Sequence, residues 1–283
     1  MGSSLAQRLQ GKPVGVVLSA GYFGFFGHAG FLQALEDHGI KAACFSGTSA
    51  GALVAAMAAA GRPAGTILDQ LCARRRADFW DPDPLGALAF GLKGPAATGL
   101  LRGAKLRGLL TRELPARFED LQTPLAVVAT NLTRNRAQVF TSGVLPARVY
   151  ASCAYPGLFR AAEVDGELFW DGGLLDKAPI EALHKAFAPR TILVHYLPSR
   201  SVLGKLAGWA AYPRAMARAM AALREDHVRL QVEAVRARGV EVVLVTSELA
   251  ALGPTRLSGG REVAAQARRK VAETLASSLD APS

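Results

Sequence analysis

Cysteine is scarce in this sequence of 283 residues, and its three copies, Cys44, Cys72 and Cys153, lie far apart. An odd number without close spacing predicts neither a disulfide framework nor a zinc site, and it fits a reducing compartment. The five histidines include no pair at metal-ligand spacing, and no phosphate-binding or calcium-binding loop pattern is present. We therefore expect neither a metal nor a cofactor.

Long apolar runs are also missing. The longest stretch, residues 50–60, is too short to cross a bilayer. Residues 1–12 contain no apolar segment of the kind that a secretory signal requires. Both absences predict a soluble, cytoplasmic protein whose contact with membranes is at most peripheral.

Acidic side chains are in the minority, with 33 Lys and Arg against 23 Asp and Glu and a formal net charge of +10. This excess favours an anionic partner such as a membrane surface, but a solvated, arginine-rich surface explains it as well. Aromatic residues make up 7% of the chain and form no series for base stacking, so we expect no nucleic-acid partner. The composition gives no indication of an oligomeric state.

Half of the residues are hydrophobic, which is enough for one large core. Continuous apolar runs alternate with amphipathic segments, a pattern typical of an α/β fold with a mainly parallel sheet. We predict one domain over residues 13–250 and a C-terminal helical tail over residues 251–283. Residues 86–101, apolar and rich in glycine, are either a mobile cap or a surface insertion. Strands are predicted at 14–18, 42–45, 124–130, 191–196 and 240–245, and helices at 31–39, 50–60, 105–114, 180–188, 213–238 and 261–279.

A G-x-S-x-G pattern, Gly47-Thr48-Ser49-Ala50-Gly51, joins one predicted strand to the next helix. At such a turn the serine is held in a strained conformation with its hydroxyl exposed, and glycine on either side lets strand and helix close on each other. The free N–H groups at the start of the helix favour negative charge beside Ser49. The alternative is an ordinary Gly/Ser turn.

Residues 19–30 form a glycine-rich stretch between the first strand and the helix predicted at 31–39. A glycine turn exposes successive backbone N–H groups, as an oxyanion hole requires. If the first two strands are parallel neighbours, this loop lies beside Ser49. The loop side chains Tyr22, Phe23, Phe25 and Phe26 are then predicted to line an apolar mouth, with core packing as the alternative.

Asp171-Gly172-Gly173 follows a predicted hairpin and ends its second strand. A carboxylate within reach of a serine hydroxyl acts as a general base if burial raises its pKa. A plain Asp-Gly turn is the alternative. No histidine has the setting of a triad base, and the serine comes too early in the chain for an α/β-hydrolase.

Three passages together resemble the patatin-like phospholipase family. They are Leu18–Glu36, Ser46–Leu53, and Ala151–Phe159 followed by Asp171-Gly172-Gly173. Their order and spacing match the family, and weaker similarity extends the match to about residues 13–200. The loop departs from the family pattern, since residues 20–25 contain neither a run of glycines nor a basic residue.

The resemblance implies a three-layer α/β/α sandwich and a Ser-Asp dyad that works without histidine or metal. It implies that Ser49 is the nucleophile and Asp171 its base, with backbone N–H groups of Gly21, Tyr22 and Ala50 in the oxyanion hole. The implied activity is cleavage of carboxylic esters of phospholipids or related acyl esters through an acyl-enzyme. Two alternatives stay open: a catalytically silent lipid- or membrane-binding protein, and an esterase or thioesterase for soluble acyl substrates.

Overall fold

The computed structural model describes residues 3–84, 94, 99–199, 211–250, 252–253 and 257–277. The strands are β1 (Val14–Leu18), β2 (Ala42–Thr48), β3 (Leu125–Asn131), β4 (Arg136–Phe140), β5 (Ala162–Val164), β6 (Glu167–Asp171), β7 (Thr191–Tyr196) and β8 (Glu241–Thr246). The α-helices are α1 (Leu5–Leu9), α2 (Phe25–Asp37), α3 (Ala50–Ala59), α4 (Ala64–Cys72), α6 (Ala104–Glu113), α7 (Leu145–Cys153), α8 (Ile180–Phe187), α9 (Ala211–Arg236) and α10 (Gly260–Ala276). Short 3-10 turns are η1 (Arg76–Asp78), η2 (Phe118–Asp120), η3 (Gly172–Leu174) and η4 (Leu257–Gly259).

The strands form one sheet in the order β5-β6-β3-β2-β1-β7-β8, with β4 also paired to β3. The pairs β3–β2, β2–β1, β1–β7 and β7–β8 are parallel, whereas β4, β5 and β6 add antiparallel pairings at the other edge. In the β1–β2 register, Leu18 lies opposite Gly47. The carboxyl ends of these two strands therefore end together, which brings the loop after β1 beside the turn after β2.

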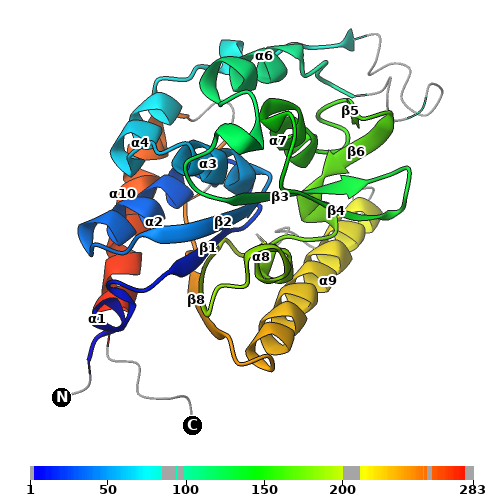
Figure 1. The fold of residues 1–283 in the computed structure, drawn as a ribbon. Helices are drawn as coiled ribbons and strands as arrows, with labels where there is room; N and C mark the ends of the chain where they lie inside the picture. The colour runs from blue at the N-terminus through cyan, green and yellow to red at the C-terminus, as the bar shows by residue number, and fades with distance from the viewer. Residues whose placement is uncertain are drawn as a thin grey trace.

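Helices cover both faces of the sheet, as Figure 1 shows. Alternate side chains of β1, such as Val14 and Val16, pack with α2, α3, α4, α7 and α10 in one apolar core. Val17 points the other way and packs with α8 and α9, together with Ile192 and Val194 of β7. This alternation buries both faces of each central strand, so the predicted three-layer α/β/α sandwich with a mainly parallel centre is confirmed.

Helix α2 begins at Phe25, whereas the sequence pattern predicted a helix only from residue 31. The glycines that made residues 25–30 look like a loop serve helix packing instead. A Cβ on Gly30 would collide with the backbone carbonyl of Ala264 on α10, and a Cβ on Gly27 would collide with the side chain of Leu249. Glycine in α2 thus allows a close helix crossing, and the loop after β1 is shorter than predicted.

The C-terminal helix α10 packs along α2 and buries Val263, Ala264, Val271 and Leu275 in the same core as β1 and α3. Residues 260–276 therefore share a core with the segment 13–250. Of the predicted cap or insertion at 86–101, only residues 94 and 99–101 belong to the described part of the chain.

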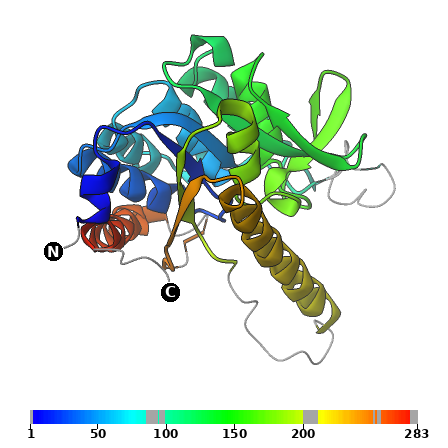
Figure 2. The ribbon, with the colours of Figure 1, turned by 60° about the horizontal axis from the view of Figure 1, so that its bottom comes forward.

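The longest helix, α9, runs out from the sheet so that its N-terminal end lies farthest from the body, as seen in Figure 2. Its inner half packs on β8 and α8 through Val228, Val232 and Val235. Across the ranges that the structure describes, no helix combines the length and the apolar run needed to cross a membrane.

Candidate active site

Ser49 occupies the sharp turn between β2 and α3, and its backbone has φ 55° and ψ −121°. A side-chain-bearing residue rarely adopts this conformation, so the turn is strained. The flanking glycines make it possible: a Cβ on Gly47 would lie 2.6 Å from the carbonyl carbon of Gly51, and one on Gly51 would lie 2.7 Å from the Ser19 carbonyl oxygen. The turn therefore has the geometry of a nucleophile elbow.

Asp171 is the last residue of β6, and it lies next to Ser49 although 122 positions separate them. The Ser49 hydroxyl donates to Oδ2 of Asp171 at 2.6 Å, and the N–H of Gly173 donates to Oδ1 at 2.7 Å. The main chain of Asp171 is held by the hydroxyl of Thr130, which donates to its carbonyl at 2.8 Å. A Cβ on Gly172 would collide with the carbonyl of Val128, so glycine is required where this turn meets β3.

Asp171 is only 4% exposed. Burial raises its pKa to about 6 from the ordinary value of 3.8, while the hydrogen bonds from Ser49 and Gly173 and the charge of Arg224 on α9 act in the opposite direction. A carboxylate with this pKa is ionised at neutral pH and is a stronger base than an exposed aspartate.

Two side chains of α7 form hydrogen bonds with the main chain of Ser49. The Ser152 hydroxyl accepts the N–H of Ser49 at 2.9 Å and donates to the carbonyl of Val128 at 2.6 Å. The Cys153 thiol lies 3.3 Å from the carbonyl of Ser49. The sequence contains both in the passage that resembles the family, but their contacts depend on how α7 sits against β2 and β3, which no local pattern reveals.

The predicted oxyanion donors belong to two segments, the start of α3 and the loop after β1. Ala50 is the first residue of α3, so its N–H has no partner within the helix. Gly21 and Tyr22 belong to a tight turn closed by a hydrogen bond of 2.9 Å from Gly24 N–H to the Gly21 carbonyl. Within the described part of the chain, no protein group accepts a hydrogen bond from the N–H of Gly21 or Tyr22.

The aromatic side chains of this loop separate into two environments. Tyr22 is 60% exposed and meets Phe23 edge to face, and Phe23 contacts both Phe25 and Phe79. Phe26 is fully buried and packs on Gly260 of α10, so it lies in the core and not at the loop surface. The contact with Phe79 links the loop to the segment after α4, a pairing that the sequence did not indicate.

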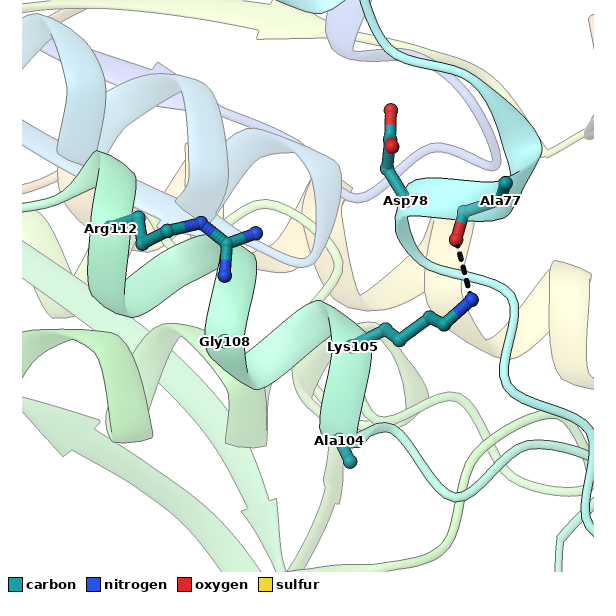
Figure 3. A pocket seen from close by; sticks show the side chains of 6 residues that line it. All are labelled: Ala77, Asp78, Ala104, Lys105, Gly108 and Arg112. Carbon is teal, nitrogen blue, oxygen red and sulfur yellow. Dashed lines mark hydrogen bonds between the residues drawn. The ribbon is translucent and has the colours of Figure 1, made fainter.

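Among the described residues, no histidine forms a hydrogen bond with Ser49 or Asp171. Within the described ranges, no group of three or more His, Cys, Asp or Glu side chains is arranged to hold a metal ion. A hollow of about 430 Å³ opens between η1 and α6 (Figure 3), where Lys105 donates to the carbonyl of Ala77 at 2.8 Å. Neither Ser49 nor Asp171 lines this hollow.

Comparison with known proteins gives matches in sequence and in fold. The patatin-like phospholipase family model matches residues 16–184. An uncharacterized NTE family protein of Mycobacterium tuberculosis is 32% identical over 201 residues, which cover 69% of this chain and 52% of that protein. Lysophospholipase NTE1 of Pyricularia oryzae is 31% identical over 180 residues, or 62% of this chain and 11% of that protein. Among solved structures, VipD from Legionella pneumophila matches with a TM-score of 0.50 and 18% identity, over 93% of this chain and 67% of VipD.

This chain spans about half the length of the mycobacterial relative and a much smaller part of the fungal one. The family match nevertheless covers more than half of the chain and includes the elbow, Asp171 and the loop after β1. The chain therefore belongs to the patatin-like phospholipase family.

Proposed function

We propose that this protein is a serine acyl hydrolase that cleaves carboxylic esters of phospholipids or related lipids with a Ser49–Asp171 dyad. The observation that supports this most directly is the 2.6 Å hydrogen bond from the hydroxyl of Ser49, whose backbone is strained, to a buried carboxylate. Membership of the family and the similarity to a protein named lysophospholipase favour a lipid ester as substrate.

In the proposed acylation step, Asp171 takes the proton of the Ser49 hydroxyl while Ser49 Oγ attacks the ester carbonyl carbon. The carbonyl oxygen becomes an oxyanion, and the N–H groups of Gly21, Tyr22 and Ala50 stabilise it. The bond to the leaving alcohol then breaks, and protonated Asp171 returns the proton to that alcohol. The product is an acyl ester on Ser49.

Deacylation repeats these steps with water as the nucleophile. Asp171 removes a proton from the water as it attacks the acyl-enzyme, and the same N–H groups stabilise the second oxyanion. Collapse releases the fatty acid and restores the Ser49 hydroxyl. Each step uses one carboxylate as both base and acid, which suits a pKa near neutral.

Labelling with a fluorophosphonate, read by intact mass, tests this proposal. Wild-type protein is expected to gain one adduct, Ser49→Ala none, and Asp171→Asn one that forms at least 100 times more slowly. Ser142→Ala, which changes an exposed serine, is the control and should label like wild type. Absence of an adduct on folded wild type would leave the catalytically silent lipid-binding alternative.

We further propose that α9 binds to an anionic membrane surface and that the protein takes its substrate from that surface. Tyr212, Met216, Leu223 and Leu230 are 75%, 48%, 65% and 55% exposed, and their spacing of four and seven residues puts them on one helix face. Residues 211–224 contain three arginines and no acidic residue. An exposed apolar face with basic neighbours is typical of helices that lie in a lipid interface.

Sedimentation with vesicles tests this second part. Binding to vesicles that contain anionic lipid should fall at least fivefold in Leu223→Glu, whereas Val139→Glu, at another exposed apolar position on β4, should bind like wild type. Activity on a short soluble ester should be equal in all three proteins. If micellar and monomeric esters are cleaved at the same rate and Leu223→Glu has no effect, the alternative of a soluble-ester hydrolase is favoured.

A further inference from the structure

Two buried histidines, far from each other in sequence, form a hydrogen bond next to the loop that carries Gly21. His28 on α2 and His195 on β7 are both fully buried, and their Nδ1 atoms are 2.8 Å apart. The other ring nitrogen of His28, Nε2, lies 2.8 Å from the carbonyl oxygen of Ser19, and Nε2 of His195 lies 3.1 Å from the hydroxyl of Ser247. Every ring nitrogen of the pair therefore has a partner.

The chemistry of the partners allows only one arrangement of protons. A carbonyl oxygen accepts but never donates, so Nε2 of His28 carries a proton. Burial lowers the pKa of His28 to about 4 and that of His195 well below its usual value, so both rings are neutral at pH 7. His28 Nδ1 is then an acceptor, His195 Nδ1 donates to it, and His195 Nε2 accepts the Ser247 hydroxyl. Phe31 stacks on the His195 ring with an angle of 4° between the planes, which fixes the ring orientation.

This hydrogen-bond chain ends on the peptide that precedes the loop with Gly21 and Tyr22. The Ser19 carbonyl and the Ala20 N–H belong to one peptide unit. The carbonyl accepts from His28, and the N–H donates to the Lys177 carbonyl at 2.7 Å. Ser19 is also held by its own N–H, which donates to the His195 carbonyl at 3.2 Å, and by its hydroxyl, which accepts the Leu197 N–H at 2.9 Å.

The Ser19 carbonyl also lies close to the nucleophile elbow, at Gly51. A Cβ on Gly51, in the first turn of α3, would lie 2.7 Å from the Ser19 oxygen. The Ser19 carbonyl therefore lies between His28 and the start of the helix that provides the Ala50 N–H. It is thus a contact between the loop after β1 and the start of α3, the two segments that carry the proposed oxyanion donors.

We propose that His28 and His195 are positioning residues. Their hydrogen-bond chain, in which each ring has one fixed tautomer, runs from Ser247 to the Ser19 carbonyl. By fixing Ser19, it holds the N–H groups of Gly21 and Tyr22 at the positions where they act together with the N–H of Ala50. The proposal rests on the acyl hydrolase function proposed above. It gives a role to two buried histidines, neither of which hydrogen-bonds to Ser49 or Asp171.

The tautomers are tested first, in wild-type protein, by long-range ¹H–¹⁵N correlation spectra of the histidine rings at pH 7. His28 is expected to be protonated only on Nε2 and His195 only on Nδ1. The opposite assignment, or averaging between tautomers, overturns the proposal. This result does not depend on enzymatic activity, so it is separate from the failure or success of the proposed function.

The positioning role is tested with His28→Phe, His28→Gln and the control His38→Gln, which changes the histidine at the end of the same helix. Each is assayed on an aryl ester and on the matched thionoester, whose sulfur accepts hydrogen bonds poorly and so gains little from oxyanion donors. His28→Phe should lower kcat/KM for the oxygen ester about 10- to 100-fold and for the thionoester less than threefold. His28→Gln, which keeps an N–H for the Ser19 carbonyl, should recover at least a third of the wild-type rate.

An equal loss on both esters, or no loss on either, overturns the proposal. The amide chemical shifts of Gly21 and Tyr22 give a readout without turnover: they should move in His28→Phe and stay unchanged in His38→Gln. If His28→Phe does not fold, the same shifts are read in His28→Gln, where loop shifts within experimental error of wild type together with the predicted tautomers support the proposal. Loop shifts that move beyond experimental error in both His38→Gln and His28→Gln contradict it.

Discussion

The Ser49 hydroxyl and the Asp171 carboxylate form a 2.6 Å hydrogen bond in which the donor is strained and the acceptor is buried. Each property has a separate origin. The strain comes from the turn between β2 and α3, and the burial comes from the packing of β6 and η3 against β3. The geometry of the pair therefore depends on how β2, β3 and β6 pack against one another.

The rate should depend on pH through Asp171. The carboxyl must be ionised to act as base, and burial raises its pKa to about 6. We expect kcat/KM for a soluble ester to fall about tenfold per pH unit below an apparent pKa near 6 and to be flat from pH 7 to 8.5. Near-UV circular dichroism at each pH separates this titration from acid unfolding. An acid limb centred near pH 4 would contradict the role of a buried base.

Replacing Asp171 should stabilise the fold above neutral pH. The folded-state pKa of about 6 lies above the ordinary value of 3.8, so this carboxyl favours the folded state at low pH and costs stability as the pH rises from about 4 to 6. The full cost is about 3 kcal/mol at 1.36 kcal/mol per pKa unit. We expect Asp171→Asn to raise the free energy of unfolding by about 1–3 kcal/mol at pH 8 and by less at pH 5.

Thermal unfolding at both pH values measures this difference. Glu163→Gln is the control, because that side chain is exposed on β5 and its carboxylate is removed without changing its size. Its melting temperature should match wild type at both pH values. A lower melting temperature for Asp171→Asn at pH 8 would show that the ionised carboxylate stabilises the fold.

The elements around Ser49 were predictable because their signals are local. Apolar runs at 14–18 and 191–196 correspond to β1 and β7, and the glycines at 47 and 51 predicted the tight turn that the structure contains. The three-layer arrangement followed from the family resemblance, and the separation of Val16 and Val17 onto opposite faces is its physical basis.

Other features depend on contacts between distant segments. Gly27 and Gly30 are a residue type typical of loops, but they lie in α2. Glycine is needed there because Leu249 and α10 pack too closely against the helix to leave room for a side chain. Phe26 was predicted at the mouth of the site, and its burial against Gly260 follows from that same helix crossing. The chain from Ser247 to Ser19 also joins separate strands and α2, so no sequence window contains it.

Gly51 should tolerate no side chain. A Cβ there would collide with the carbonyl oxygens of Leu18 and Ser19, which are backbone atoms and have little room to move. We expect Gly51→Ala to cost about 1–3 kcal/mol of stability and to reduce fluorophosphonate labelling at least tenfold. The control is Gly65→Ala in α4, where the nearest atom lies 3.9 Å away. That change should be neutral or stabilise by about 0.5–1 kcal/mol, and equal effects at the two glycines would contradict the close contact.

Ser152 should support the elbow through its hydroxyl. Ser152→Ala leaves the N–H of Ser49 and the carbonyl of Val128 without their partner, which should cost about 1–3 kcal/mol. Because the Ser49 main chain then loses one of its fixed points, kcat should fall about tenfold while KM changes little. Steady-state kinetics with urea unfolding measures both effects, and Ser142→Ala is the exposed control. Unchanged kcat in a destabilised variant would limit Ser152 to a structural role.

The C-terminal helix should unfold together with the rest of the protein. Leu275 on α10 is fully buried in the core that α2 shares, so Leu275→Ala should cost about 2–5 kcal/mol. Lys270→Ala, at an exposed position of the same helix, should change stability by less than about 0.5 kcal/mol. Urea unfolding is followed by near-UV circular dichroism and by Ser49 labelling. Both signals should shift by the same amount in Leu275→Ala if residues 260–276 and the site belong to one cooperative unit. A shift that leaves labelling unchanged would instead show that residues 251–283 behave as a separable tail.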